Sequence, residues 1–245
     1  MTSSATPVAS TPVCGHGRVA MDPRVFEAVA PPSERVRRHR EKYVGLFPHR
    51  ARVLDIGCAG GTVLDLLRAH GLRAVGVEIA PRAAQAARAR GHEVHAADAA
   101  EFLRGRPGPF GGILLAHVIE HLTPPAAWRL LALCARELSA DGTLVLLTPN
   151  YRDFTVRPQF WADPTHVRPY PPRLLQALAS AAGLQVVLCG EDPDNVLRDP
   201  DLALWQRTLR RLHNLVRRWI IGNYWYLGDL VLIARKGAAG EMGTE

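Results

Sequence analysis

The hydrophobic and polar positions of residues 52–150 follow two alternating periodicities. Short apolar runs typical of buried strands lie at residues 52–57, 73–79, 93–98, 112–118 and 143–150. Segments with apolar residues at helical spacing separate them, at residues 61–71, 81–91, 99–105 and 124–142. Because strands joined by helices of this length form parallel βαβ units covered on both faces, the pattern predicts a doubly wound, Rossmann-like α/β fold.

The pattern extends to both sides of this stretch. An arginine-rich helix is predicted over residues 34–47, with Ser33 placed to cap it. A helix at residues 171–183 and a strand at 184–190 follow, and a last strand lies near the C-terminus. The sheet is therefore expected to have seven strands, most of them parallel.

Composition divides the chain into a regular core and other segments. We predict a core over residues 33–190, a helical insertion over 191–226 and the last core strand over 227–236. Residues 1–32, rich in Ser, Thr, Pro and Ala at their start, and residues 237–245 are predicted to be flexible tails.

The insertion contains a basic amphipathic helix over residues 201–221. Its apolar face carries Leu202, Trp205, Leu209, Leu212, Val216 and Trp219, and its other face carries Arg207, Arg210, Arg211, Arg217 and Arg218. We interpret the apolar face as a cap over the domain. Weak contact of the arginines with an anionic membrane surface is the alternative.

Composition indicates a globular protein but does not identify its ligand. The chain has 245 residues, of which 47% are hydrophobic, which suffices for a proper core. It has no apolar run of the roughly 18 residues that a membrane span needs, so we expect a cytoplasmic protein. Its four cysteines form no C-x-x-C pair, so neither a disulfide framework nor a cysteine zinc site is indicated. Its net charge of +7 is compatible with nucleic acid, anionic lipid or phosphorylated small molecules as binding partners and does not distinguish among them.

A glycine turn follows the first strand of the core, in the stretch VLDIGCAGG. Gly57, Gly60 and Gly61 would let a ligand approach the backbone closely, and Glu78 ends the next strand, where a carboxylate can bind two ribose hydroxyls. Nicotinamide dinucleotides and S-adenosylmethionine both contain an adenosine ribose. Ala59 stands where a G-x-G-x-x-G motif needs its second glycine, which disfavours a dinucleotide.

This stretch resembles the first motif of the class I S-adenosylmethionine-dependent methyltransferases. The resemblance covers about residues 33–190, with residues 228–236 matching the last strand. It implies S-adenosylmethionine as the cofactor. It also implies a set of binding residues: Asp55, Gly57, Cys58, Ala59, Gly60 and Gly61 for the methionine portion, Glu78 with Ile79 for the ribose, Asp98 and Ala99 for the adenine, and Arg40 and Tyr43 near the cofactor carboxylate.

The stretch HVIEHL, residues 117–122, has two interpretations. His117, Glu120 and His121 match the H-x-x-E-H pattern of a family of zinc proteases, which would make the protein a zinc hydrolase. The apolar run before it instead predicts a buried strand, and methyltransferases have similar V-I-E-H-L segments at this place. We therefore expect His117 at a strand end near the transferred methyl group, Glu120 and His121 organising the loop, and no metal.

The stretch QFWADPTHVRPYPP, residues 159–172, follows the fifth predicted strand. Loops at the ligand edge that mix aromatic residues with Asp, His and Arg often bind acceptors, so we predict that Trp161, Arg168 and Tyr170 contact the substrate, together with Asn150. D-P-T-H-V-R-P moreover resembles a methyltransferase subgroup that modifies bacterial polysaccharides and other glycans. That resemblance implies a sugar hydroxyl or a related oxygen as the acceptor.

These observations predict an O-methyltransferase for a saccharide or another small molecule. We expect His166, supported by Asp163, to be the general base, with His117 as the second candidate. The case for a nucleic-acid substrate is weak, because HVIEHL is unlike the (D/N/S)-P-P-(Y/F/W) motif of enzymes that methylate base amines. The alternatives are the zinc hydrolase and a cofactor-binding module that does not catalyse.

Overall fold

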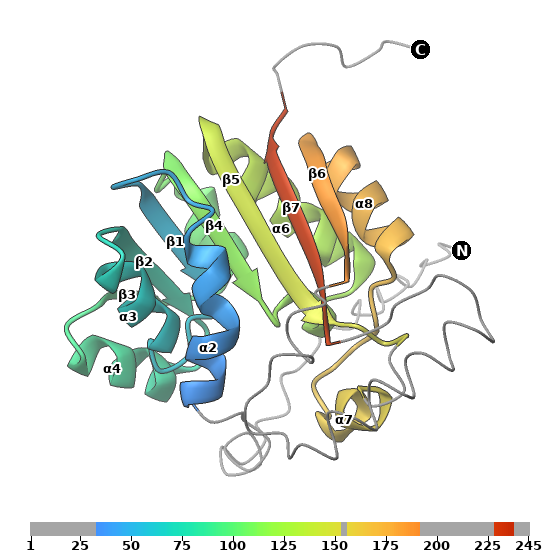
Figure 1. Ribbon diagram of the computed structural model, residues 1–245, viewed down its shortest axis with the longest axis horizontal. Coiled ribbons are helices and arrows are strands. Elements are labelled where there is room, and N and C mark those ends of the chain that lie inside the picture. The colour runs from blue at the N-terminus through green and yellow to red at the C-terminus, as the bar shows by residue number, and fades with distance from the viewer. Residues whose placement is uncertain (1–32, 153–155, 192–227, 238–245) are drawn as a thin grey trace, which may run out of the picture. The chain divides into compact units, whose positions relative to one another are not determined.

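A seven-stranded sheet with the strand order β3-β2-β1-β4-β5-β7-β6 forms the centre of the structure (Figure 1). This computed structural model describes residues 33–152, 156–191 and 228–237. The strands are β1 (Arg52–Ile56), β2 (Arg73–Glu78), β3 (Glu93–Ala96), β4 (Phe110–Ala116), β5 (Leu138–Pro149), β6 (Leu184–Glu191) and β7 (Asp229–Lys236). Only β7 runs antiparallel to its neighbours, β5 and β6. The prediction of a doubly wound, mostly parallel sheet of seven strands is confirmed.

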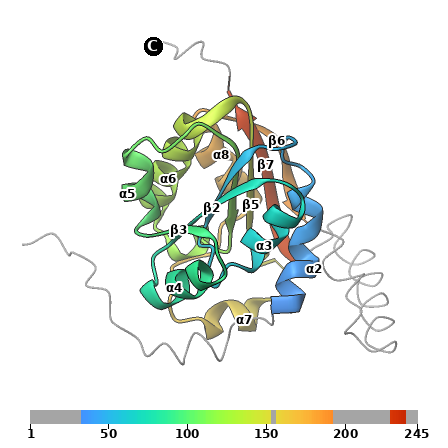
Figure 2. The same ribbon diagram turned by 90° about the vertical axis from the view of Figure 1, so that its left-hand side faces the viewer.

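Helices cover both faces of this sheet (Figure 2). The helices are α2 (Ser33–Val44), α3 (Thr62–Ala69), α4 (Pro81–Ala89), α5 (Ala99–Arg104), α6 (Pro124–Glu137), α7 (Arg157–Ala162) and α8 (Pro172–Ala181), with a short 3-10 helix at Ile119–His121. Buried side chains of α5, α6 and α8 belong to the hydrophobic cluster on one face. Those of α2, α3 and α4 belong to the cluster on the other face.

The central strands contribute side chains to both clusters. Leu54 and Ile56 of β1 belong to the α6 side, whereas Val53 belongs to the α3 side. In β4, Ile113 belongs to the α6 side and Leu114 to the α3 side. Because successive side chains of a strand point to opposite faces, a strand covered on both faces needs apolar residues throughout. This explains the continuous apolar runs of the sequence.

Several predicted boundaries differ from those of the structure, and two of the differences have a clear physical cause. The helix predicted over residues 124–142 ends at Glu137, and β5 begins directly at Leu138. Leu138 is buried and pairs with Phe110 of β4, so tertiary contacts override the local helical pattern there. The strand predicted over residues 112–118 ends at Ala116, because His117 has a left-handed backbone with φ of 57°.

Some predictions concern parts of the chain that the structure does not describe. The predicted tails and the helical insertion lie outside the described ranges, apart from residues 191 and 237. Among the described helices, none is long and apolar enough to cross a membrane.

The packing of the Phe47 ring against Gly112 in β4 generates a test of the core. A β-carbon added at Gly112 would overlap the Phe47 ring, which is buried. We expect Gly112→Ala to lower the free energy of unfolding by about 1–3 kcal/mol, because overpacking forces a buried ring to move. Urea unfolding should show a lower midpoint with an unchanged slope.

Gly190→Ala in β6 is the matched control. A β-carbon there would have no heavy atom within 4 Å. Its unfolding midpoint should stay close to that of the wild-type protein. Equal destabilisation by both substitutions would show that the Phe47 contact is not the cause.

Candidate active site at the carboxyl ends of the strands

The predicted site residues gather at one edge of the sheet, where the parallel strands end. Gly57 follows β1, Glu78 ends β2 and His117 follows β4. β7 runs antiparallel to β5 and pairs Asp229, its first residue, with Pro149, so Asp229 lies at this edge too. The strand order reverses direction between β1 and β4, and in open α/β sheets ligands bind at such a switch point.

The loop after β1 has a left-handed backbone at three of its residues. Gly57, Ala59 and Gly61 have φ angles of 75°, 45° and 85°. A β-carbon on Gly57 would lie 2.7 Å from Cγ2 of Val118, so glycine is required there for space as well. Ala59, which departs from the usual glycine, keeps the left-handed conformation at a cost of roughly 1–2 kcal/mol. A β-carbon on Gly60 would have open space around it, which leaves the loop accessible to a ligand.

Glu78 ties this loop to the end of β2. Its Oε2 accepts a hydrogen bond from the backbone nitrogen of Ala59 at 2.9 Å, and its Oε1 accepts one from that of Ala80 at 2.8 Å. Each carboxylate oxygen can accept a further hydrogen bond, as ribose hydroxyls would require. The neighbouring Ile79 is 46% exposed and offers an apolar surface at the same strand end.

Asp55 is buried close to Glu78, and its Oδ2 has no hydrogen-bond partner among the described residues. Burial, followed by the negative charge of Glu78, raises the pKa of Asp55 to about 8, against the opposing effect of Arg40. A buried polar atom without a partner is uncommon in native proteins and marks a place where a ligand can donate. The site therefore fits a cofactor that has an amino group.

The other residues predicted to bind the cofactor have structural contacts as well. Asp98 caps α5: its Oδ1 accepts from the backbone nitrogens of Ala100 at 2.9 Å and Glu101 at 3.1 Å. Ala99 is the first residue of that helix. Tyr43 and Cys58 are buried in the cluster on the α3 side, and burial raises the pKa of the Cys58 thiol.

A chain of charged groups connects α2, β7 and the loop after β4. Arg40 Nη1 contacts Asp229 Oδ2 at 2.9 Å, and the same oxygen lies 3.3 Å from His117 Nε2. His117 Nδ1 lies 3.1 Å from Glu120 Oε1, and the Thr148 hydroxyl donates to Glu120 Oε2 at 3.1 Å. Asp229 is thus a central residue of the site that the sequence pattern did not reveal, because its partners lie far away along the chain.

His117 has a carboxylate on each ring nitrogen. Burial lowers the pKa of His117, but the carboxylates of Asp229 and Glu120 outweigh this effect and raise it to about 9. The ring is therefore an imidazolium at neutral pH, with no lone pair for a metal or a proton. In addition, His117 follows a strand and does not share a helix with His121, so the structure does not support the H-x-x-E-H zinc interpretation.

His166 differs from His117 in its protonation. Its Nδ1 lies 2.7 Å from the carbonyl oxygen of Phe160. A carbonyl oxygen only accepts, so Nδ1 carries the hydrogen and the neutral ring keeps its lone pair on Nε2. Burial holds the pKa of His166 below its ordinary value of 6.5. Nε2 lies 3.8 Å from Oδ2 of Asp163.

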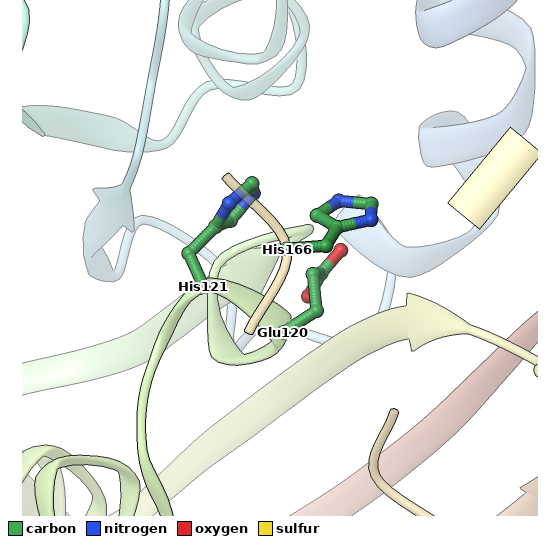
Figure 3. A group of neighbouring side chains, drawn as sticks. All are labelled: Glu120, His121 and His166. Atoms are coloured by element: carbon green, nitrogen blue, oxygen red, sulfur yellow. The ribbon is translucent and has the colours of Figure 1, made fainter. Parts of the chain in front are cut away.

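The D-P-T-H loop is docked on the loop after β4. The backbone nitrogens of Val167 and Arg168 donate to the carbonyl oxygen of Glu120 at 2.8 and 3.3 Å. The ring centroids of His121 and His166 are 4.7 Å apart. Figure 3 shows Glu120, His121 and His166 gathered in one group, although His166 comes from a distant part of the sequence.

The residues predicted to contact the acceptor divide into two groups. Trp161 is 57% exposed, and Arg168 is partly exposed with its guanidinium 5.8 Å from the centre of the Tyr170 ring. Tyr170 itself is 2% exposed, and its hydroxyl donates to the carbonyl oxygen of Leu122. Asn150 is also buried, and its Nδ2 has no hydrogen-bond partner within the described ranges.

Comparison with known proteins identifies the class of this protein. A family model described as a methyltransferase domain matches residues 28–188, and the chain belongs to this family. A crystal structure of an S-adenosylmethionine-dependent methyltransferase from Archaeoglobus fulgidus is 26% identical, with a TM-score of 0.70 over 86% of this chain and 97% of that chain. The described core is thus an S-adenosylmethionine-dependent methyltransferase domain, and S-adenosylmethionine is its cofactor.

Two further proteins show partial likeness to this chain. A ubiquinone biosynthesis O-methyltransferase from Xylella fastidiosa (strain 9a5c) is 34% identical over 108 residues, which is 41% of this chain and 42% of that relative. This chain therefore matches less than half the length of that relative. The cyclopropane synthase MmaA2 from Mycobacterium tuberculosis shares the fold, with 15% identity and a TM-score of 0.57 over 81% of this chain and 83% of that chain. The predicted likeness to a glycan-modifying subgroup stays a prediction.

The double ion pair of His117 has a testable consequence for stability. A pKa raised from 6.5 to about 9 in the folded state means that the charged ring stabilises the fold fully below pH 6.5 and loses this effect as the pH rises through about 9. We expect the stability difference between the wild type and His117→Gln to be largest at pH 6 and to shrink towards pH 9.5. Denaturant unfolding at a series of pH values measures this difference.

His95→Gln is the control for this experiment, because His95 is 45% exposed and lies outside the charge network. This substitution should change the free energy of unfolding only slightly at any pH. A loss in His117→Gln that is constant from pH 6 to 9.5 would mean that His117 is not held in its charged form.

Proposed function

We propose that this protein transfers the methyl group of S-adenosylmethionine to a hydroxyl oxygen of a small-molecule acceptor, with a saccharide as the acceptor class. The observation that carries the proposal is His166, whose lone pair is directed to Nε2 by the bond between Nδ1 and the Phe160 carbonyl. Its low pKa keeps that lone pair available at neutral pH. A general base for a hydroxyl needs both properties.

The cofactor would occupy the edge formed by the ends of β1, β2 and β3. The unpaired Asp55 Oδ2 and the left-handed loop from Gly57 to Gly61 support binding of the methionine portion. Glu78 with Ile79 suits the ribose, and Asp98 with Ala99 suits the adenine. Arg40 and Tyr43 remain candidates near the cofactor carboxylate, although the Arg40 guanidinium is already paired with Asp229.

The chemistry requires one proton acceptor and correct alignment. The acceptor oxygen forms a bond to the methyl carbon, while the carbon–sulfur bond breaks and its electron pair stays on sulfur. The hydroxyl proton passes to Nε2 of His166, and the Asp163 carboxylate 3.8 Å away stabilises the resulting imidazolium. Thr165 holds Asp163 in place, with its hydroxyl donating to Oδ1 at 2.6 Å. Alignment supplies much of the acceleration in such a displacement.

The surroundings of His166 support a ring-shaped acceptor. Trp161 is exposed and packs edge-on against Phe160, with 5.1 Å between the ring centroids. The centroid of the Phe160 ring lies 4.4 Å from that of the His166 ring. An exposed aromatic face beside polar groups suits the apolar face of a sugar ring. The second candidate acceptor is a phenolic hydroxyl, which the name of the ubiquinone biosynthesis relative favours.

The buried Asp55 predicts a proton release on cofactor binding. With a pKa of about 8, its carboxyl is mostly protonated at pH 7, and a bound amino group would favour the ionised form. We therefore expect binding of S-adenosylhomocysteine at pH 7 to release up to about one proton per chain, and to become tighter as the pH rises towards 8. Calorimetry in two buffers of different ionisation enthalpy measures the release.

Asp55→Asn is the matched control, because it keeps the shape and cannot lose a proton. The proton release should be absent in this variant. Equal binding enthalpies of the wild-type protein in both buffers would refute the assignment of Asp55 to the amino group.

His166→Ala tests the general base. We expect kcat to fall by roughly 10²–10⁴-fold, while the affinity for S-adenosylhomocysteine changes little. His117→Gln should lower kcat less than His166→Ala, because the His117 ring has no lone pair to offer. Full turnover in His166→Ala would refute the assignment.

The assay for these variants also identifies the acceptor. Cell extract incubated with S-adenosylmethionine labelled in its methyl group gives a labelled product whose chemical class distinguishes a saccharide from a phenol. A protein that binds S-adenosylhomocysteine but labels nothing in a broad acceptor panel would be a cofactor-binding module that does not catalyse.

A further inference from the structure

We propose that Glu120, His121 and His166 form a binding site for one divalent first-row transition-metal ion. Each residue offers one ligand atom, and these atoms all lie within 4.8 Å of one another (Figure 3). This triad differs from the H-x-x-E-H pattern, because it omits His117 and recruits His166 from the D-P-T-H loop. Three protein ligands leave coordination positions open, which is typical of ion sites that bind a substrate.

The protein orients His121 as a metal ligand. Its Nδ1 lies 2.9 Å from the Thr165 hydroxyl oxygen, and that hydroxyl donates its only hydrogen to Asp163 Oδ1 at 2.6 Å. The hydroxyl oxygen must therefore accept from His121, so Nδ1 carries the hydrogen. Nε2 of the neutral ring is left as an electron-pair donor. A carboxylate behind a histidine, here through Thr165, is the usual support for a metal-binding imidazole.

His166 has the same arrangement with a different partner. The Phe160 carbonyl oxygen accepts the hydrogen of Nδ1 at 2.7 Å, which again leaves Nε2 as the donor. Both histidines therefore have Nδ1 fixed by an acceptor and Nε2 left as an electron-pair donor, and their ring centroids are 4.7 Å apart.

Glu120 supplies the negative charge. Its side chain is fully buried, and the backbone nitrogens of Val167 and Arg168 hold its carbonyl oxygen. His117 and Thr148 each contact one carboxylate oxygen, and each oxygen keeps acceptor capacity for an ion. The carboxylate thus offers an anionic ligand beside the two imidazoles.

The donor set selects the kind of ion. Two imidazole nitrogens and one carboxylate suit Zn²⁺, Co²⁺, Ni²⁺ or Fe²⁺, whereas Mg²⁺ prefers oxygen ligands and water. If the proposed methyl transfer to oxygen holds, an open position on the ion would receive the acceptor hydroxyl and lower its pKa. The ion and a proton compete for Nε2 of His166, so in the metal-bound protein the ion would activate the hydroxyl and the released proton would pass to solvent water.

Metal titration of the full-length protein tests the site without cofactor or acceptor. After removal of metal with a chelator, Co²⁺ is added and its visible absorption followed, and Zn²⁺ binding is measured by calorimetry. We expect one ion per chain. His121→Gln and Glu120→Gln should each weaken binding by at least tenfold, and Thr165→Val, which leaves all three ligands in place, should weaken it by roughly 10–100-fold.

His95→Gln is the matched control, because it removes an exposed histidine beside a glutamate elsewhere on the sheet edge. It should bind the ion as the wild type does. Absence of binding, binding unchanged in both His121→Gln and Thr165→Val, or displacement of Co²⁺ by equimolar Mg²⁺ would overturn the proposal. Because the readout is metal binding alone, it is independent of whether the protein methylates a hydroxyl.

Discussion

The two hydrogen bonds from the backbone nitrogens of Val167 and Arg168 to the carbonyl oxygen of Glu120 hold the candidate site together. They join a loop that leaves β4 to a loop that precedes α8, two segments far apart in the sequence. Together with the contact between Thr165 and His121, this junction fixes His166 close to His121 and Glu120. Backbone groups make the contact, so it depends on the path of the chain more than on any one side chain. The catalytic and metal proposals both rest on it.

A series of ion pairs lies at the same edge of the sheet. Arg40 and His117 share Asp229, and His117 also contacts Glu120, so positive and negative groups alternate from α2 to β5. Buried charges are costly unless they are paired, and this alternation pairs the buried Arg40 and Glu120. As a result, two histidines of similar intrinsic chemistry are separated in function. His117 is held as a cation between carboxylates, whereas His166 faces a carbonyl oxygen and keeps its lone pair.

The fold alone says little about the acceptor. The same sheet occurs in a cyclopropane synthase and in an Archaeoglobus fulgidus methyltransferase, so the acceptor must be chosen by the loops at the carboxyl ends of the strands. Here those loops present a buried Glu120 close to an oriented His166, and an exposed Trp161 that packs on Phe160 beside His166. The proposed hydroxyl acceptor and the proposed ion would both bind at these loops.

The sequence by itself determined the sheet, the helices between its strands, and the glycine loop with Glu78, because periodicity and backbone freedom are local properties that survive in a single chain. It also predicted Asp55 and His166 as site residues, which remain proposals. Only the tertiary structure decided that Leu138 belongs to a strand, that Tyr170 is buried, and that Asp229 pairs with His117. These outcomes depend on contacts between residues remote in the chain. The role of a histidine, as base, cation or metal ligand, is decided by the partners on its two ring nitrogens, and folding alone brings those partners to it.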